Sequence, residues 1–371
     1  MKILLAPDKF KGSLSAEGVC EALSRGMLKA HPQLKIISRP LADGGDGSLA
    51  ILDHYFELET HELEVSDPLG RPILAQYKMA EGAAYIEMSE ASGLVLLQEA
   101  ERDCMATTSY GTGELILDAI KKGAKDIYLF IGGSATNDGA MGIAAALGYR
   151  FLDEKGEALA PIGRNLLFVE EIDDKQLELA LQELKVKVVC DVNNPFYGPE
   201  GAAYVYAAQK GADKDEIELL DEGLKNLSRV LKENDYPDIA EVPGAGAAGG
   251  VGGGSIAFLG AELMSGIQTF LEISKLEELL KEADLIISGE GKMDSQTIHG
   301  KVVSGVHGLA QTYEKPLIGV CGAAEQGVAE KLSLEAVYAV LDRSKSVEEA
   351  MSKAAEKLEE IGEEIMRNLL M

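Results

Sequence analysis

The chain has 371 residues, including 41 glycines and no tryptophan, and it carries a formal net charge of -27. Single cores tend to divide beyond ~250 to 300 residues, so this length predicts two domains. The negative charge argues against nucleic acid or an anionic membrane as a partner, because both need a basic face. Backbone N–H groups, a metal ion or a few locally concentrated cations must therefore bind any anionic ligand.

The first residues, "MKILLAPDKF", contain an apolar run too short for a signal peptide, and they favour a first strand. No segment approaches the ~18 uninterrupted apolar residues of a membrane span. The four cysteines lie far apart and form no C-x-x-C pair, which excludes a local metal knuckle or redox motif. We expect a soluble cytoplasmic protein with reduced thiols.

Two strand–loop–helix units are predicted in the first 55 residues. "KILLA", residues 2 to 6, is followed by a glycine-containing loop and by a helix that Ser15 can cap. "KIISRP" predicts a second strand, and the acidic, glycine-rich "LADGGDGS" opens a second helix. Two such units in succession indicate a doubly wound parallel sheet.

From about residue 57 the pattern changes. "FELETHELEVS" and "ILAQYKMA" show partial alternation and are joined by "DPLGRP", which predicts an antiparallel pair. Strand–helix units return with "KDIYLFIGGS" and "KVKVVCDVNN", and residues 213 to 235 form an amphipathic helical pattern. "ADLIISGEG", "KPLIGVCG" and "LEAVYAVLD" are three further strand candidates. "PGAGAAGGVGGGS", residues 243 to 255, is either a flexible linker or a ligand loop.

The expected fold class is therefore α/β, with a doubly wound parallel-sheet domain interrupted by a second, mixed-sheet α/β domain. We place the first domain at residues 1–60 and 285–371 and the inserted domain at 61–284. Five polar loops, most of them rich in glycine, follow strands or precede helices, and ligands bind at such loops in open α/β sheets. The sequence contains no Walker A motif, and its first strand–loop–helix unit has no G-x-G-x-x-G. These absences argue against an ordinary P-loop fold and against a dinucleotide-binding fold.

The loop "IGGSATNDGAMG" has more glycines than a turn needs. Backbone and side-chain donors of Gly132, Gly133, Ser134, Thr136 and Asn137 could surround phosphate oxygens without much cationic charge. The alternative is a tight turn in which Asn137 or the following aspartate caps the next helix.

Charged residues of the other loops are candidates for the chemistry itself. Lys11 in "DKFKGS" could meet an anionic substrate or the transferred phosphoryl group, although a solvated surface loop is the alternative; Lys9 is expected to be peripheral. His299 is a weaker candidate for ligand contact. Five carboxylates could each be a turn or capping residue, but together they suit Mg²⁺ binding and a base that accepts a hydroxyl proton. They are Asp43, Asp46, Asp191, Glu290 and Asp294.

In order and spacing, these stretches resemble the bacterial glycerate kinase family, from Met1 to the C-terminal helix. The resemblance rests on "LAPDKFKGSLSA", "LADGGDG", "IGGSATNDGAMG", "DVNNPFYGPEGAA", "PGAGAAGGVGGG" and "SGEGKMDSQT". It departs at Lys9, where the family often has serine, so Lys11 is the lysine carried over. The resemblance implies a flavodoxin-like domain with an inserted α/β domain, the active site in the cleft between them, and ATP-dependent phosphorylation of D-glycerate with Mg²⁺. The 2-phosphoglycerate product is favoured over 3-phosphoglycerate.

With glycerate as the substrate, the candidate residues take the following roles. Lys11 or Arg71 would neutralise its carboxylate, and Asp191 and Asn193 would hold its hydroxyls. Asp43 and Asp46 are further substrate-binding candidates. Asp191 is ranked before Asp294 and Asp43 as the general base, because it follows a strand that would hold it rigidly. Residues 132–134, 136 and 137, with Gly289, Gly291 and Lys292, would bind the nucleotide, and Asp294 and Glu290 would bind the metal. A kinase for another small hydroxy acid and a non-catalytic relative remain alternatives, and a homo-oligomer remains possible.

Overall fold

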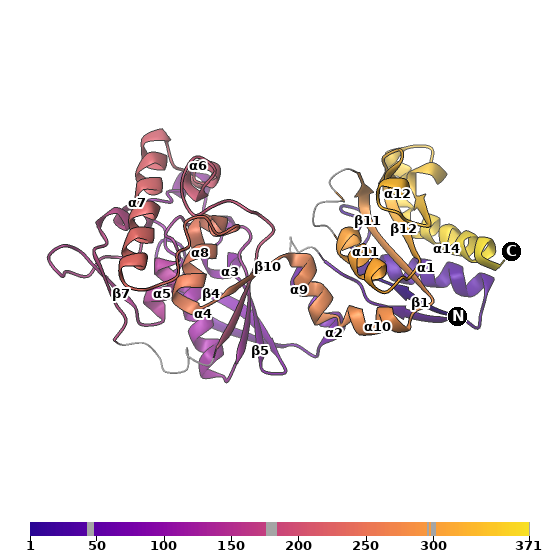
Figure 1. The fold of residues 1–371 in the computed structure, drawn as a ribbon, viewed down its shortest axis with the longest axis horizontal. Helices are drawn as coiled ribbons and strands as arrows, with labels where there is room; N and C mark the ends of the chain where they lie inside the picture. The colour runs from indigo at the N-terminus through magenta and orange to yellow at the C-terminus, as the bar shows by residue number, and fades with distance from the viewer. Residues whose placement is uncertain (43–47, 176–183, 295–296, 298–301, 371) are drawn as a thin grey trace. The chain divides into compact units, whose positions relative to one another are not determined.

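The computed structural model describes residues 1–42, 48–175, 184–294, 297 and 302–370. The chain divides into two compact units, one of residues 1–56 and 265–371 and the other of residues 57–264 (Figure 1). Each unit is built around its own sheet.

The sheet of the first unit is entirely parallel, with the strand order β13-β12-β11-β1-β2. Its strands are β1 (Lys2–Leu5), β2 (Lys35–Ser38), β11 (Leu285–Met293), β12 (Leu317–Ala324) and β13 (Ala336–Ala339). Because β1 lies between β2 and β11, the chain reverses its direction of winding at β1, as in flavodoxin-like folds. The predicted doubly wound parallel sheet is confirmed.

Helices α1 and α14 cover one face of this sheet and form much of the core of the first unit with β1, β11 and β12. The two helices approach closely where a Cβ on Gly26 would lie 1.9 Å from the Glu359 carbonyl oxygen. Ser15 caps α1 as predicted, by accepting a hydrogen bond from the Gly18 N–H at 3.1 Å. The helices are α1 (Ala16–Ala30), α2 (Ser48–Tyr55), α9 (Gly266–Ile273), α10 (Leu276–Glu282), α11 (Val302–Thr312), α12 (Val328–Lys331), α13 (Val347–Ser352) and α14 (Ala354–Leu370).

The stretch "SGEGKMDSQTIHGK", one of the five polar loops expected from the sequence, is still part of a strand as far as Met293. Strand β11 continues through Gly289 and Gly291 and pairs in parallel with β12, with Lys292 opposite Ala323 and Met293 opposite Ala324. A Cβ on Gly289 would lie 2.2 Å from the Val320 carbonyl oxygen, so this glycine allows close strand packing. Glycines in sequence favoured a loop, whereas the pairing with β12 extends the strand.

The second unit contains a six-stranded mixed sheet with the order β10-β9-β6-β5-β4-β3. Strands β3, β4 and β5 pair antiparallel, and "DPLGRP" joins the first two of them as predicted, whereas β5, β6, β9 and β10 pair in parallel. Two short strands, β7 and β8, form a separate antiparallel pair. The strands are β3 (Glu59–Ser66), β4 (Pro72–Ala80), β5 (Ala83–Glu87), β6 (Asp126–Phe130), β7 (Arg150–Leu152), β8 (Glu171–Asp173), β9 (Lys185–Val189) and β10 (Glu262–Met264).

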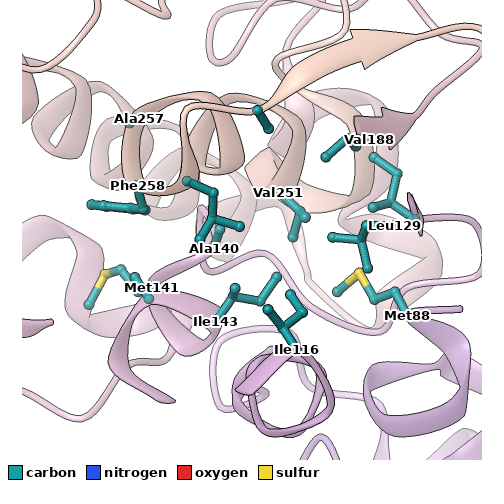
Figure 2. Packing of buried hydrophobic residues seen from close by; sticks show 14 of the residues in the cluster. Met88, Ile116, Leu129, Ala140, Met141, Ile143, Val188, Val251, Ala257 and Phe258 are labelled. Atoms are coloured by element: carbon teal, nitrogen blue, oxygen red, sulfur yellow. The ribbon is translucent and has the colours of Figure 1, made fainter. Parts of the chain in front are cut away.

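Helices pack around this sheet and bury a large apolar cluster. Figure 2 shows Val251 and Phe258 of α8 near Ala140, Met141 and Ile143 in that cluster. The amphipathic helix predicted at 213–235 is confirmed as α7, capped by Asp213. The helices are α3 (Ser89–Ser92), α4 (Tyr110–Lys121), α5 (Met141–Ala146), α6 (Ala202–Tyr206), α7 (Lys214–Glu233) and α8 (Ala247–Leu259).

The glycine-rich stretch 243–255 is neither a flexible linker nor an open loop, because most of it forms the buried helix α8. Three consecutive residues, 248 to 250, have left-handed backbone angles and kink its first turn. A Cβ on Gly249 would lie 2.1 Å from the Thr136 carbonyl oxygen, and one on Gly254 would lie 2.1 Å from the Gly139 carbonyl oxygen. These glycines therefore let the helix backbone pack directly on the loop after β6.

Candidate active site

The parallel strands β5, β6 and β9 bring three loops to the carboxyl edge of the second unit's sheet. Residues 88–93 follow β5, residues 131–140 follow β6, and residues 190–196 follow β9. The first two loops are tied together, because Leu94 N–H donates to the Gly133 carbonyl at 2.8 Å and Ala135 N–H donates to the Ser92 carbonyl at 2.9 Å. The loop after β6 is thus a structured platform, with Gly132 and Gly133 exposed on it.

A buried lysine that sequence reasoning missed lies behind this loop. Lys210 Nζ donates hydrogen bonds to Ser134 Oγ at 2.8 Å and to the Thr136 carbonyl at 2.7 Å. The Lys210 side chain is 2% exposed, and burial lowers its pKa to about 8. In the sequence the residue stands in "AAQKGAD", far from the glycine-rich loops, and a lysine before a glycine gives no signal by itself.

Asp138 in the same loop has a structural role. Its carboxylate accepts hydrogen bonds from the N–H and hydroxyl of Ser109, and from the N–H groups of Ala140 and Gly142 at the start of α5. Burial raises the pKa of this carboxyl above its ordinary range, while the four donors act in the opposite direction. As the alternative interpretation expected of this aspartate, Asp138 accepts a hydrogen bond from the first turn of α5, at the Gly142 N–H, although the N-cap position itself is Ala140.

Several buried polar atoms of the loop after β6 and of α8 lack partners among the described residues. Among the residues that the structure describes, the Thr136 hydroxyl, both amide atoms of Asn137 and the Ser255 hydroxyl are buried without a hydrogen-bond partner. Buried polar groups are normally paired with protein or water, so such a cluster marks a place where water or a ligand group completes the hydrogen bonding. Thr136 and Asn137 lie inside the loop, whereas Ser134 is 8% exposed.

The two residues that were predicted to hold the substrate hydroxyls follow β9. Asp191 and Asn193 are both exposed, and β9 ends at Val189, two residues before Asp191. The next residue, Asn194, fixes the loop: its Nδ2 donates to the Glu200 carbonyl at 2.7 Å, and its Oδ1 accepts from the Tyr206 hydroxyl at 2.6 Å. The loop thus presents Asp191 and Asn193 to solvent at the same sheet edge as Ser134.

Arg71 lies at this edge too, in the turn between β3 and β4. Its guanidinium donates to Asp67 at 2.5 Å and to Glu101 at 2.7 Å, so two carboxylates already hold it. These contacts raise the pKa of Arg71, and the Gln98 N–H together with Arg71 lowers the pKa of Glu101. A substrate carboxylate would have to compete with both partners for this guanidinium.

In the first unit, Lys11 lies beyond the carboxyl end of β1. It is exposed on a turn in which Phe10 N–H donates to the Leu14 carbonyl at 2.8 Å and Gly12 has a φ of 74°. The turn borders a cavity of about 190 Å³ that Gly291 and Met351 also line. Asp8, which sequence reasoning did not single out, is 8% exposed beside the same turn and accepts the Lys9 N–H at 2.6 Å.

The end of β11 carries a second set of predicted residues. Glu290 is 5% exposed and accepts a hydrogen bond from the Thr297 hydroxyl, which in turn accepts from the Asp294 N–H at 3.0 Å. Lys292 forms an ion pair with Asp294 at 2.9 Å, and this contact raises the pKa of Lys292. Across the described part of the chain, no three His, Cys, Asp or Glu side chains are grouped so that they could hold a metal ion by themselves.

The remaining candidates, Asp43, Asp46 and His299, lie outside the described residues. The structure thus places the predicted residues on two edges. Lys11, Gly289, Glu290, Gly291, Lys292 and Asp294 lie in the first unit. The second unit holds Arg71, Gly132, Gly133, Ser134, Thr136, Asn137, Asp191 and Asn193.

A flavodoxin-like sheet and a mixed sheet, each with hydroxyls, carboxylates and a lysine at its carboxyl edge, are the arrangement of an α/β enzyme that acts on small anionic ligands. A profile of the glycerate kinase family matches residues 3–370. Glycerate 2-kinase of Escherichia coli (strain K12) is 41% identical over 362 residues, which cover 96% of this chain and 95% of that protein. Glycerate kinase of Halalkalibacterium halodurans is 39% identical over 367 residues, which cover 98% of this chain and 97% of that one.

Comparison with solved structures also finds similarity to a glycerate kinase. The crystal structure of a protein assigned as glycerate kinase 2 from Salmonella typhimurium LT2 matches with a TM-score of 0.88 and 39% identity, covering 100% of this chain and 98% of that one. The chain belongs to the glycerate kinase family. The function that the resemblance implied, a glycerate kinase, is confirmed at this level, and so is its class as a phosphoryl transferase. Each described helix is too short or too polar to cross a membrane.

Proposed function

We propose that this chain transfers the γ-phosphoryl group of ATP to the 2-hydroxyl of D-glycerate. The observation that carries the proposal is the match over nearly the whole chain to relatives named glycerate kinase, one of them glycerate 2-kinase. Membership in a kinase family implies ATP as the phosphoryl donor. The polar loops at both sheet edges support this reaction, because phosphoryl transfer needs mainly positioning and charge neutralisation.

In the proposed reaction both sheet edges take part. Residues 132–134 and the end of β11 would bind phosphate groups, and Lys11 would neutralise charge on the substrate or on the phosphoryl group. Asp191 would accept the proton of the attacking hydroxyl, and Asn193 would hold that hydroxyl beside it. Arg71 is the weaker candidate for the glycerate carboxylate, because Asp67 and Glu101 already hold it.

The proposed Mg²⁺ site uses two carboxylates at the end of β11, Glu290 within the strand and Asp294 directly after it. The ion usually binds through one or two carboxylates together with phosphate oxygens, so a pair such as Glu290 and Asp294 is sufficient. Glu290 is largely buried near Thr297, and Asp294 faces Lys292, so both carboxylates are held in place. When bound, the metal would neutralise charge on the phosphate groups.

The proposed location is the cytoplasm. All four cysteines are free thiols, and three of them are buried, which supports a reducing compartment. The net charge of -27 argues against nucleic acid as a partner, and ATP and glycerate are the proposed partners.

A coupled ADP-release assay with D-glycerate tests the proposal, followed by phosphorus NMR of the product. Turnover with D-glycerate and a 2-phosphoglycerate signal would support it. A 3-phosphoglycerate signal would leave the kinase activity standing and overturn the regiochemistry. Turnover with other hydroxy acids alone would replace the substrate, and turnover with none would make the chain a non-catalytic relative.

A further inference from the structure

Lys210 is the buried cation of the second unit that the proposed function has not used. Its ammonium donates to Ser134 Oγ at 2.8 Å and to the Thr136 carbonyl at 2.7 Å, and its side chain is 2% exposed. Taking an ammonium group out of water is costly unless polar partners replace the water. Burying the Lys210 ammonium against the loop after β6 therefore costs free energy, which its two hydrogen bonds offset only in part.

The backbone around Lys210 fixes the position of this charge. Residues 208–210 form a 3₁₀ turn that ends at Gly211, whose φ is 100°. A Cβ on Gly211 would lie 2.0 Å from the Arg102 carbonyl oxygen, and Cys104 N–H donates to the Lys210 carbonyl at 3.2 Å. The ionisable groups that act on the ammonium are Cys104 and Asp138, and the Asp138 carboxylate is already hydrogen-bonded to four donors.

The hydrogen bond from Lys210 decides what Ser134 can do. An ammonium has three donors and no acceptor, so Ser134 Oγ must be the acceptor in this contact. The hydroxyl proton of Ser134 is then directed to another group, and the adjacent positive charge strengthens it as a donor. Ser134 is 8% exposed and follows the exposed Gly132 and Gly133, so its hydroxyl is the group of this pair that a ligand at the loop surface would meet.

The net charge of the chain bears on how it could bind an anion. With a net charge of -27, the protein repels anions at long range, so an anionic ligand must be attracted by local positive charge. A buried charge is screened by salt much less than an exposed one. The partnerless Thr136 hydroxyl and Asn137 amide lie in the same loop, two and three residues beyond Ser134.

We propose that Ser134, polarised by Lys210, is the donor of an oxyanion-binding site at the carboxyl end of β6. Ser134 would touch the anion, and Lys210 would act through Ser134 as a positioning residue. This inference rests on the proposed function, which supplies two oxyanions: a phosphate group of ATP and the carboxylate of D-glycerate. The chemistry of recognition is the same for both, because each offers acceptor oxygens and negative charge.

The test compares Ser134→Ala and Lys210→Met with two matched controls. Ser228→Ala removes a hydroxyl with the same 8% exposure from α7, and Lys225→Met removes an exposed lysine from the same helix. Calorimetric titration with sulfate measures anion affinity without any turnover. We expect both site variants to bind sulfate at least ~10-fold more weakly, the scale of one charge-assisted hydrogen bond, and both controls to stay within about twofold of wild type.

Separate titrations with ATP and with D-glycerate identify the anion. Weaker binding of ATP alone assigns the site to a phosphate group, and weaker binding of glycerate alone assigns it to the carboxylate; either result supports the inference. Unchanged affinity for all three ligands in Ser134→Ala, which keeps the buried lysine and hence its packing, would overturn it. Wild-type turnover of D-glycerate is measured in parallel, so that a failure of this site is distinguished from a failure of the proposed function.

The pH profile separates a role in binding from a role in structure. If the charge on Lys210 matters, wild-type affinity for sulfate should fall as the pH rises through about 8, because sulfate keeps its charge there while the lysine loses its proton. The fall should be ~10-fold between pH 7 and 9.5 and should be absent in Lys210→Met. Parallel profiles for the two proteins would contradict the proposal.

Discussion

The carboxylate of Asp138 accepts hydrogen bonds from both the N–H and the hydroxyl of Ser109, at 2.7 and 2.8 Å. This contact joins the loop after β6 to the start of α4, and both residues are fully buried. In Asp138→Asn, an NH₂ group replaces one oxygen and must face a donor. We expect the free energy of unfolding to fall by about 2 kcal/mol, the cost of leaving a buried donor unsatisfied. Urea unfolding measures it.

The control for this variant is Asp215→Asn, which changes an exposed carboxylate in the first turn of α7. Surface substitutions of this kind usually stay within about 0.5 kcal/mol. If the two variants had equal stability, the hydrogen bonds to Asp138 would contribute little to the fold of this loop.

Gly249 should tolerate no side chain. Its φ is 71°, and a Cβ would lie 2.1 Å from the Thr136 carbonyl oxygen. We expect Gly249→Ala to lower the free energy of unfolding by more than about 3 kcal/mol, because left-handed strain and a backbone clash add together. Gly260 is the matched control: its φ is 61° and a Cβ there meets open space, so Gly260→Ala should cost only about 1 kcal/mol. Thermal unfolding of both variants checks the difference, and equal losses would show that strain alone matters.

Lys11 should matter for the reaction and not for folding, because it is exposed on a turn at the carboxyl end of β1. We expect Lys11→Met to keep its melting temperature and to lose at least ~100-fold in kcat/KM, about 2.7 kcal/mol of transition-state stabilisation. Lys35→Met is the control, because Lys35 is exposed at the opposite end of the same sheet, where β2 begins. Steady-state kinetics with both substrates compares them; activity of Lys11→Met within a few-fold of wild type would remove Lys11 from the site.

Much of the fold could be predicted because apolar runs and turn residues report local structure. The strand at residues 2–5, the helix capped by Ser15 and the antiparallel pair around "DPLGRP" each have a local cause. The misassigned stretches depend on contacts far along the chain. Strand β11 runs to Met293 because β12 pairs with it, and residues 247–259 form a buried helix because glycines fit against the loop after β6.

In the candidate site, too, features local in the sequence could be predicted, whereas contacts between distant segments could not. Glycines, hydroxyls and carboxylates clustered in one loop are visible in a sequence, so residues 132–137 and 289–294 could be named as candidates. Lys210 could not, because nothing near it in the sequence marks it; the folded chain brings it to Ser134, 76 positions away. The contacts of Asp138 with Ser109 and of Arg71 with Glu101 could not be predicted either, because Ser109 and Glu101 lie on other segments.

Asp191 is the leading candidate for the general base, and its substitution distinguishes two roles. If Asp191 accepts the hydroxyl proton, Asp191→Asn should keep its affinity for ATP and D-glycerate while kcat falls by ~100-fold or more. If it binds Mg²⁺ instead, added Mg²⁺ should restore part of the rate. The measurement is a Mg²⁺ titration at saturating glycerate, with Glu262→Gln, an exposed carboxylate at the amino end of β10, as the control. Wild-type kcat at every Mg²⁺ concentration would exclude both roles.

The buried charge of Lys210 should make stability depend on pH. Burial lowers its pKa from 10.5 to about 8, so between these values the unfolded chain holds a proton that the native protein has lost. Stability therefore rises with pH in this window, and below pH 8 the native state carries the full cost of the buried charge. The free energy of unfolding of wild type, minus that of Lys210→Met, should increase by about 2 kcal/mol between pH 7 and 9.5. Taking the difference cancels the titrating groups that do not interact with Lys210. Urea unfolding across this range measures it, and the same difference for Lys225→Met, an exposed lysine, should stay constant. A constant difference for Lys210→Met as well would mean that the lysine keeps an ordinary pKa in the native protein.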